Sequence, residues 1–564
     1  EFDRDRNLNT TYNGNQQVLS SGLQADFTNQ GKMLYQYDYL SFGNSFSGNK
    51  HSLLGHFQFN KWKISETGSV MKSQSNLSQT QFIRNQTQLR FHWNKNWTGA
   101  TFRAENNQER LTTTQQLSGI SQRFSEYGYF IGRGDSTKVF TQLGYLHRLN
   151  DSVVSGNLQR VNYSQSYYLK SKLIQNEKND LSLFINYRKL NFQDPSKNNI
   201  PSLNSRLLYN AFLWKQLVQS NTLYETLSGT VAQQDFTYLE VDAGRGVYTW
   251  IDYNNNGIQE LSEFEVAQFI DQAKFVRVFL PNQIYIKTHQ NKFSQTLTLN
   301  PLAWQSPTGI KKTLAHFYNQ TAYLIERKLI QSNNGFDLNP FGQNGSEVLG
   351  LNTSIRNSLF YNRGKQHHSV TYNYLQNQIR NLLSIGLQEN RNVSHQVLYN
   401  HVIQKSWTIN SGIKSIHIEN FSENFENRNY IFKGYQFSPK IGYLFTKETS
   451  VDVFYEYQQK HNQINNLEKL NQQRLGVSFT YVSAQQFSAN GEVSLYENNY
   501  QGPVNSPIIY QLLEGLLPGK NWVWRLLVQR NITNYLDVNL NYQGRQNETS
   551  KTIHTGSVQL RAHF

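Results

Sequence analysis

The chain has 564 residues, of which 14% are aromatic and only 16% charged, and its formal net charge is +15. A soluble enzyme of this length normally carries more charge. Because there is no cysteine, the chain cannot form a disulfide or a thiolate metal site. No apolar run approaches the roughly 18 residues of a membrane helix, which excludes a helical membrane protein. Since its basic residues are scattered, we expect no nucleic-acid partner, whereas phosphate-bearing lipid head groups suit dispersed positive charge.

Alternation of apolar and polar residues starts by about residue 16 and recurs along the whole chain. It is clear at 181–188, 451–458, 475–481, 536–543 and 556–564. Each segment is about ten residues long, which suits a tilted strand that crosses an outer membrane, although a soluble β-sandwich also alternates. Charged residues occupy the polar positions of these strands and are predicted to line a lumen: Arg188, Asp452, Glu456, Asp537 and Arg561.

Tryptophans stand beside short Lys, Asn, Gly or Ser turns at predicted strand ends: Trp62, Trp93, Trp97, Trp407 and Trp522. Indole prefers the head-group layer of a membrane, so this placement predicts an aromatic girdle. The alternative is that these rings cap hairpins of a soluble sheet.

Tight turns alternate with longer polar connections near 239–287, 326–349, 417–430, 460–471 and 499–520. Short turns at one end and long loops at the other are typical of outer-membrane barrels. The predicted fold is therefore all-β: a single transmembrane antiparallel β-barrel over 1–564, of about 26 strands in a range of 22–28. An insert over 240–287 interrupts it.

The insert contains the segment WIDYNNNGIQELSEFE, which has the ligand spacing of an EF-hand-type calcium loop. The candidate ligands are Asp252, Asn254, Asn256, the Ile258 carbonyl, Glu260 and Glu263, with Gly257 at the sharp turn. A short helix is predicted to follow, and a structural Ca²⁺ would stiffen the insert outside the membrane. Ile258 stands at position seven, where an EF-hand usually has its apolar residue at eight, and a plain surface turn remains the alternative.

The last strand, GSVQLRAHF, ends in Phe and resembles the assembly signal of Gram-negative outer-membrane proteins. The Tyr/Asn/Gln-rich strands and the insert resemble large outer-membrane barrels of the Bacteroidota. The resemblance implies insertion by the barrel-assembly machinery and residence in the cell outer membrane, among its lipids and lipopolysaccharide. Because the chain begins at Glu1 without Met or an apolar signal region, we expect a processed protein or a fragment.

No HExxH, GxSxG, P-loop or dinucleotide-binding motif is present, so we expect no enzyme. The favoured function is a barrel component of a larger envelope assembly for secretion, translocation or surface export, whose long loops bind protein partners. The alternatives are a stand-alone outer-membrane channel for solutes and a soluble β-rich surface adhesin. A diffusion porin needs only 16 to 18 strands, which disfavours a simple pore.

Overall fold

The computed structural model describes the chain except for residues 1–14, 44, 136, 283, 305–307, 332–334, 343–347, 366, 465–467, 484–486, 534 and 563–564, and the side chains of 303 and 304. The described part is mostly β-strand, and 25 strands belong to one large sheet. This number lies within the predicted range, and the expected all-β antiparallel fold is confirmed. Phe564, which carries the resemblance to an assembly signal, lies outside the described residues.

The chain divides into two compact units. The first unit comprises Glu1–Asn210 with Tyr224–Ser228, and the second comprises Ala211–Leu223 with Gly229–Phe564. In the first unit each strand from β1 to β10 pairs antiparallel with the next. The strands are β1 (Gln16–Phe27), β2 (Gly31–Phe42), β3 (Phe46–Phe59), β4 (Trp62–Ser75), β5 (Ser78–Trp93), β6 (Asn96–Leu111), β7 (Gln122–Gly134), β8 (Phe140–Val154), β9 (Asn157–Gln175) and β10 (Asn179–Phe192). Residues of β11 (Ile200–Leu213) and β12 (Val218–Gln233) are divided between the units.

In the second unit, each strand from β17 to β29 pairs antiparallel with the next. Its strands are β17 (Ile284–Leu299), β18 (Phe317–Ile330), β19 (Val348–Tyr361), β20 (His368–Leu383), β21 (Gly386–Ile403), β22 (Trp407–Ser422), β23 (Tyr430–Leu444), β24 (Thr449–Asn462), β25 (Lys469–Ser483), β26 (Phe487–Gln501), β27 (Gly519–Thr533), β28 (Leu536–Asn547) and β29 (Ile553–Ala562). Short helical segments lie in its connections: η4 (Pro301–Trp304), α1 (Ile310–Leu314), η5 (Glu426–Arg428) and α2 (Pro507–Leu513). No helix in the described part of the chain is long and apolar enough to span a membrane.

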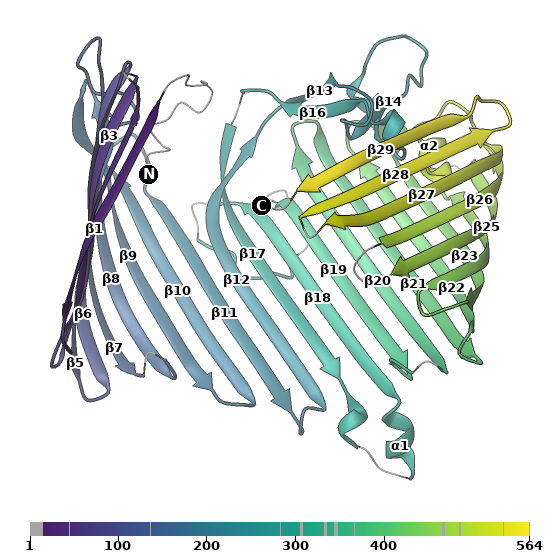
Figure 1. Cartoon of the computed structure of the whole chain (residues 1–564), viewed down its shortest axis with the longest axis horizontal. Coiled ribbons are helices and arrows are strands. Elements are labelled where there is room, and N and C mark those ends of the chain that lie inside the picture. The colour runs from purple at the N-terminus through teal and green to yellow at the C-terminus, as the bar shows by residue number, and fades with distance from the viewer. Residues whose placement is uncertain are drawn as a thin grey trace. The chain divides into compact units, whose positions relative to one another are not determined.

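The insert between β12 and β17 forms its own four-stranded sheet (Figure 1). It contains β13 (Phe236–Glu240), β14 (Tyr248–Trp250), β15 (Phe264–Val266) and β16 (Phe275–Phe279), with the 3-10 turns η2 (Leu261–Glu263) and η3 (Ile270–Gln272). The predicted short helix after the calcium-type loop is wrong. Phe264 and Glu265 are both buried and β15 pairs with β14, so tertiary burial on two sides favours a strand there.

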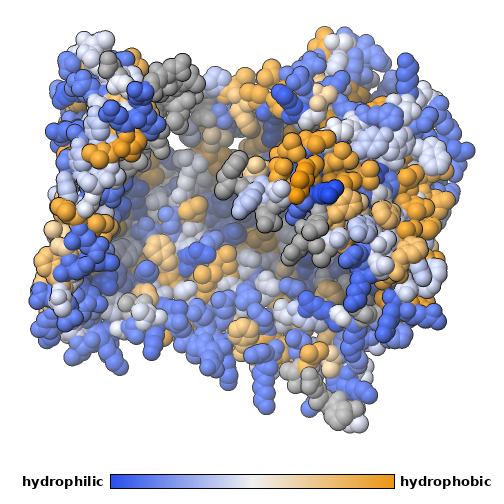
Figure 2. Space-filling model, viewed as in Figure 1, coloured by the Kyte–Doolittle hydropathy of each residue, from blue (hydrophilic) through white to orange (hydrophobic). Residues whose placement is uncertain are grey.

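In the second unit, the two faces of the sheet differ in chemistry as predicted. Leu475, Val477 and Phe479 of β25 are exposed on one face, which we call the outer face. Arg474 stands on the opposite, inner face and forms ion pairs with Glu456 and Glu492. Figure 2 shows hydrophobic side chains gathered over β28 and β29, where Val558 and Leu560 are about two-thirds exposed at 64% and 66%. An apolar outer face and a charged inner face form the wall of an outer-membrane barrel.

In the first unit the two faces of the sheet also differ. One tryptophan of the predicted aromatic girdle, however, does not face outward. Trp62 is exposed and contacts Phe91, which stacks near Trp93, at the turn end of β4 and β5. Trp97, however, is only 2% exposed and donates its Nε1–H to Gln142. Its ring lies over Gly132, where any side chain would collide with it, so this tryptophan fills the inner face. Trp93 and Trp97 flank one turn, and the pairing of the hairpin turns only one of them outward.

Candidate functional site: a docked insert on the inner face

An aromatic core gives the insert a fixed shape of its own. The Tyr238 and Phe264 rings stack with centroids 4.0 Å apart, and Phe275 meets Phe264 edge-on at 5.1 Å. Glu263 is buried beside them, where its carboxylate accepts hydrogen bonds from Trp250 Nε1 at 2.8 Å and from the Tyr253 backbone N–H at 3.2 Å. The last predicted calcium ligand therefore helps to close the core of the insert.

The other predicted ligands share one exposed loop. Asp252 accepts from the backbone N–H groups of Asn256 and Gly257 at 3.1 and 2.8 Å. Asn254 donates to Glu260 at 3.2 Å, and Asn256 accepts from the Ile258 backbone N–H at 2.7 Å. Among the described residues, no group of three or more His, Asp or Glu side chains is placed to hold a metal. The loop thus gathers oxygen atoms without Glu263, and calcium binding stays a prediction.

An ion pair fixes the insert to the loop after β22. Arg428, in η5, donates Nη2 to Glu265 at 2.8 Å, and the Glu265 side chain is only 2% exposed. The other guanidinium nitrogen, Nη1, donates to the backbone carbonyls of Ser262 and Phe264 at 3.4 and 3.2 Å. Gln511 of α2 adds a second donor to the Glu265 carboxylate at 2.9 Å. One buried carboxylate therefore joins the insert to two loops.

A second ion pair fixes the insert to β28. Arg545 donates to both carboxylate oxygens of Asp271, at 2.5 and 2.7 Å, and its guanidinium lies over the Phe269 ring at 4.2 Å. Bidentate pairs of this kind are the strongest and most directional side-chain hydrogen bonds. Tyr510 of α2 completes the contact, because its hydroxyl accepts from the Gln268 backbone N–H at 3.1 Å and donates to the Val266 carbonyl at 3.2 Å.

These contacts place the insert on the inner face of the second unit. The strand registers put Arg545, Val523 and Ser494 on the same face as Arg474. The helix α2 lies on that face too, since Leu512 and Leu513 pack against Phe432 and Leu470 of the strands. Ser506 caps this helix and Pro507 begins it, which explains why a short helix forms in a strand-rich chain.

Two polar cavities adjoin the docked elements. One, of about 350 Å³, lies between the insert and β20–β22 and is lined by Glu265, Arg428, Asn390 and Asn420 among others. The other, of about 270 Å³, is lined by residues of β21–β26 and by Glu514 after α2. It holds the cations Lys414, Lys460 and Arg474 and the carboxylate of Glu456. Positively and negatively charged side chains thus line both cavities next to the insert and α2. Such a lining suits a polar solute.

Burial controls the electrostatics of the docking contact. Desolvation raises the pKa of the Glu265 carboxyl above its ordinary value, and the Arg428 guanidinium opposes this only in part. Desolvation also raises the pKa of the Tyr253 hydroxyl, helped by the charge of the nearby Glu265. The docking residues Glu265, Asp271, Arg428 and Arg545 were not predicted from the sequence. The signal available in the insert was that Glu265 and Asp271 each stand directly after an apolar or aromatic residue, Phe264 and Ile270.

The chain matches no protein-family model and no curated protein. Among solved structures it is similar to the copper transporter OprC, with 9% identity and a TM-score of 0.32, over 94% of this chain and 74% of that one. It is also similar to the FrpB iron transporter from Neisseria meningitidis, with 10% identity and a TM-score of 0.30. This match covers 97% of this chain and 82% of the transporter chain. A third similar structure is the siderophore receptor PiuA from Acinetobacter baumannii, with 9% identity and a TM-score of 0.29. This match covers 93% of this chain and 76% of the receptor chain.

The strands themselves are diagnostic, because they carry apolar side chains on the outer face, aromatic rings at their turns and ion pairs on the inner face. A polypeptide can meet lipid in this way only when its backbone hydrogen bonds are satisfied by neighbouring strands. The described strands therefore have the side-chain pattern of a transmembrane β-barrel wall, with one face suited to lipid and the other to water.

Proposed function

We propose that this chain is an outer-membrane transport barrel in which the insert 236–279 caps the path of a polar solute. The proposal rests on one observation: the insert is held by Arg428–Glu265 and Arg545–Asp271 on the inner face of the strands. In a membrane barrel this face lines the lumen, and a lumen formed by so many strands needs an obstruction to prevent leakage.

The docking contacts suit a fixed cap better than a loosely tethered loop. Each of the two ion pairs has a side chain that is mostly removed from water, namely Glu265 at 2% and Arg545 at 15% exposure. Because these side chains are buried, removal of one partner of either pair would leave an uncompensated charge and would be strongly destabilising. Solute must therefore pass around the cap, or a further event must release it.

Conductance in a planar bilayer tests this proposal. The purified protein is compared with a variant in which 236–279 is replaced by a short Gly/Ser linker. We expect small or rare openings for the intact chain and large, steady ones for the variant. Equal conductance of the two proteins would contradict a capping role, provided that both show the heat-sensitive gel mobility of a folded barrel.

A role in a larger envelope assembly is a second candidate. The insert exposes apolar side chains at Leu239, Val247, Val266 and Phe279, each more than half exposed. Such side chains suit contact with a protein partner. The test is the native mass after gentle detergent extraction, with partners identified by mass spectrometry. A particle that contains only this 65.7 kDa chain and detergent would exclude the assembly.

We also propose that the loop 252–260 binds Ca²⁺ through Asp252, Asn254, Asn256, the Ile258 carbonyl and Glu260. Several hard oxygen donors on one exposed loop support it. Calorimetric titration with Ca²⁺ should show binding that Asp252→Ala combined with Asn254→Ala abolishes. The control is Asp242→Ala, which removes an exposed carboxylate of the same insert. Heat signals that do not differ between the two variants would disprove the site.

A further inference from the structure

Basic residues form a row across four neighbouring strands of the second unit. The registers place His417 of β22 opposite Lys433 of β23. They place His461 of β24 between Lys433 on one side and Lys469 of β25 on the other. Lys469 shares a face of β25 with Leu475, so these four residues, which we call the basic row, stand on the outer face. The insert docks on the other face, and the basic row is therefore separate from the capped path proposed above.

Little negative charge balances the basic row. Lys433 and Lys469 are exposed, and within the described part of the chain neither of them forms an ion pair. His417 differs, because its Nε2 lies 2.6 Å from a carboxylate oxygen of Glu419. Adjacent strands are about 4.8 Å apart, so the two lysines that flank His461 start about 10 Å apart, and their long side chains can reach one anion between them. A bound anion would relieve the repulsion between these cations.

The outer face changes its chemistry step by step toward the basic row. On β25 the side chains of this face pass from apolar to amide to cationic: Phe479, Val477, Leu475, Gln473, Asn471 and Lys469. On the two neighbouring strands, the paired rings of Tyr435 and Tyr457 lie between the apolar and the basic residues. The same order, from hydrocarbon through tyrosine to cation, is found from the core of a bilayer to its head groups.

The length of β25 puts Lys469 at the height of the head groups. This strand has 15 residues, and at about 3.4 Å per residue and a tilt of about 40° it spans roughly 40 Å along the membrane normal. The apolar band of an outer-membrane barrel is only about 25 Å tall. Phe479, near the far end of β25, is still apolar and exposed. The excess length therefore lies mainly toward Lys469, which is the first residue of the strand.

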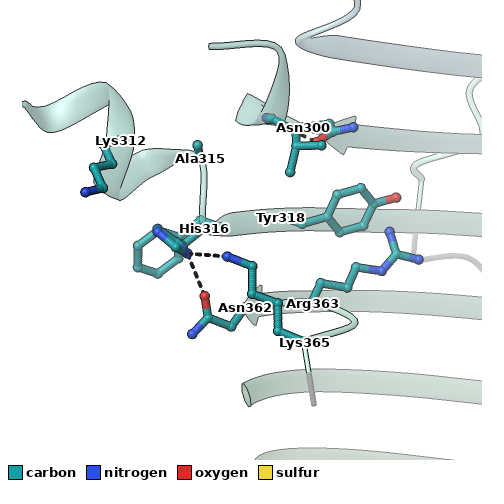
Figure 3. A pocket seen from close by; sticks show the side chains of 10 residues that line it. Asn300, Lys312, Ala315, His316, Tyr318, Asn362, Arg363 and Lys365 are labelled. Carbon is teal, nitrogen blue, oxygen red and sulfur yellow. Dashed lines mark hydrogen bonds between the residues drawn. The ribbon is translucent and has the colours of Figure 1, made fainter. Parts of the chain in front are cut away.

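Cations at the opposite strand ends lack this arrangement. Lys312, Arg363 and Lys365 border a cavity of about 640 Å³ beside the turn after β19 (Figure 3). Arg363 lies over the Tyr318 ring, which the registers put on the inner face. Figure 3 shows Lys312 and Arg363 directed apart, while the Lys365 ammonium lies 3.3 Å from His316 Nδ1. These cations do not converge on one ligand from the lipid side.

We propose that the basic row binds a phosphate group of lipopolysaccharide, the phosphorylated glycolipid of the outer leaflet. The row lies at the strand ends beside the connection that holds Arg428 and the docked insert. In an outer-membrane barrel the long connections face outward and the short turns face the periplasm. Lysine binds phosphate as a point charge, and a lipid phosphate held there would place its acyl chains along Val477 and Phe479 of the same face.

Native mass spectrometry tests this proposal by lipid retention. The purified full chain is transferred into detergent that contains lipid A, the phosphorylated anchor of lipopolysaccharide, or the same lipid with its phosphates removed. Lys433→Gln combined with Lys469→Gln is compared with Lys405→Gln combined with Lys447→Gln, which removes two exposed lysines from turns at the opposite strand ends. We expect the native chain and the control to retain lipid A, and the first variant to retain it about thirtyfold less.

Each outcome decides the proposal. Equal retention of lipid A by the two double variants would overturn the site, as would equal retention of both lipids by the native chain. If inorganic phosphate binds in calorimetry and lipid A is not retained, the anion is a soluble phosphate and the lipid source is wrong. Because the substituted side chains are exposed, the variants should fold, and heat-sensitive gel mobility checks this.

Discussion

Replacement of Arg428 by Met should release the insert from the strands. This change leaves the Glu265 carboxylate buried with Gln511 as its only remaining donor from the loops, and it also removes two hydrogen bonds to backbone carbonyls. Removal of one partner of a buried ion pair costs about 3–5 kcal/mol. At about 1.4 kcal/mol for each factor of ten, the opening equilibrium of the insert should rise between roughly a hundredfold and a few thousandfold.

Hydrogen exchange at the Gln268 amide measures this opening directly. That N–H donates to the Tyr510 hydroxyl of α2, so it is protected only while the insert is docked. The matched control is Arg245→Met, which breaks the exposed pair with Asp242 inside the insert. Unchanged protection of Gln268 in Arg428→Met, or an equal loss in Arg245→Met, would refute the view that the buried pair holds the insert.

Three further results are expected. Because burial raises the pKa of Glu265 in the docked state, docking should be strongest at acid pH and weaken as pH rises above the ordinary carboxyl range, and Glu265→Gln should remove this slope in Gln268 exchange. Arg545→Gln should expose the segment around Asp271 to protease while β28 keeps its strand pairing, as limited proteolysis can show. Val477→Arg on the outer face should cost about 2–4 kcal/mol in folding into lipid vesicles, whereas Thr480→Arg on the inner face should cost little.

The sequence predicts the strands well because their pattern is local. Leu475, Val477 and Phe479 alternate with polar residues, and the period of two alone decides that they share a face. The prediction that Trp97 belongs to the aromatic girdle is wrong, because its position beside a turn does not show to which face of the sheet its ring points.

The docking site could not be predicted because its partners are far apart in the sequence. Glu265 and Arg428 are separated by 163 residues, and Asp271 and Arg545 by 274. The segment after the calcium-type loop has several helix-forming residues, yet burial of Phe264 and Glu265 against other elements makes it a strand. Glu263 shows the same effect, because its position in a ligand pattern gives no hint that Trp250 binds it.

One face of these strands is expected to meet lipid and the other to meet water. Because the chain has no cysteine, single cysteines can be introduced without background labelling. Val477→Cys and Phe479→Cys on the outer face are compared with Ser478→Cys and Thr480→Cys on the inner face, in intact membranes treated with a water-soluble maleimide. We expect labelling of the inner pair alone, and labelling of the outer pair only after denaturation. Equal labelling of both pairs before denaturation would contradict it.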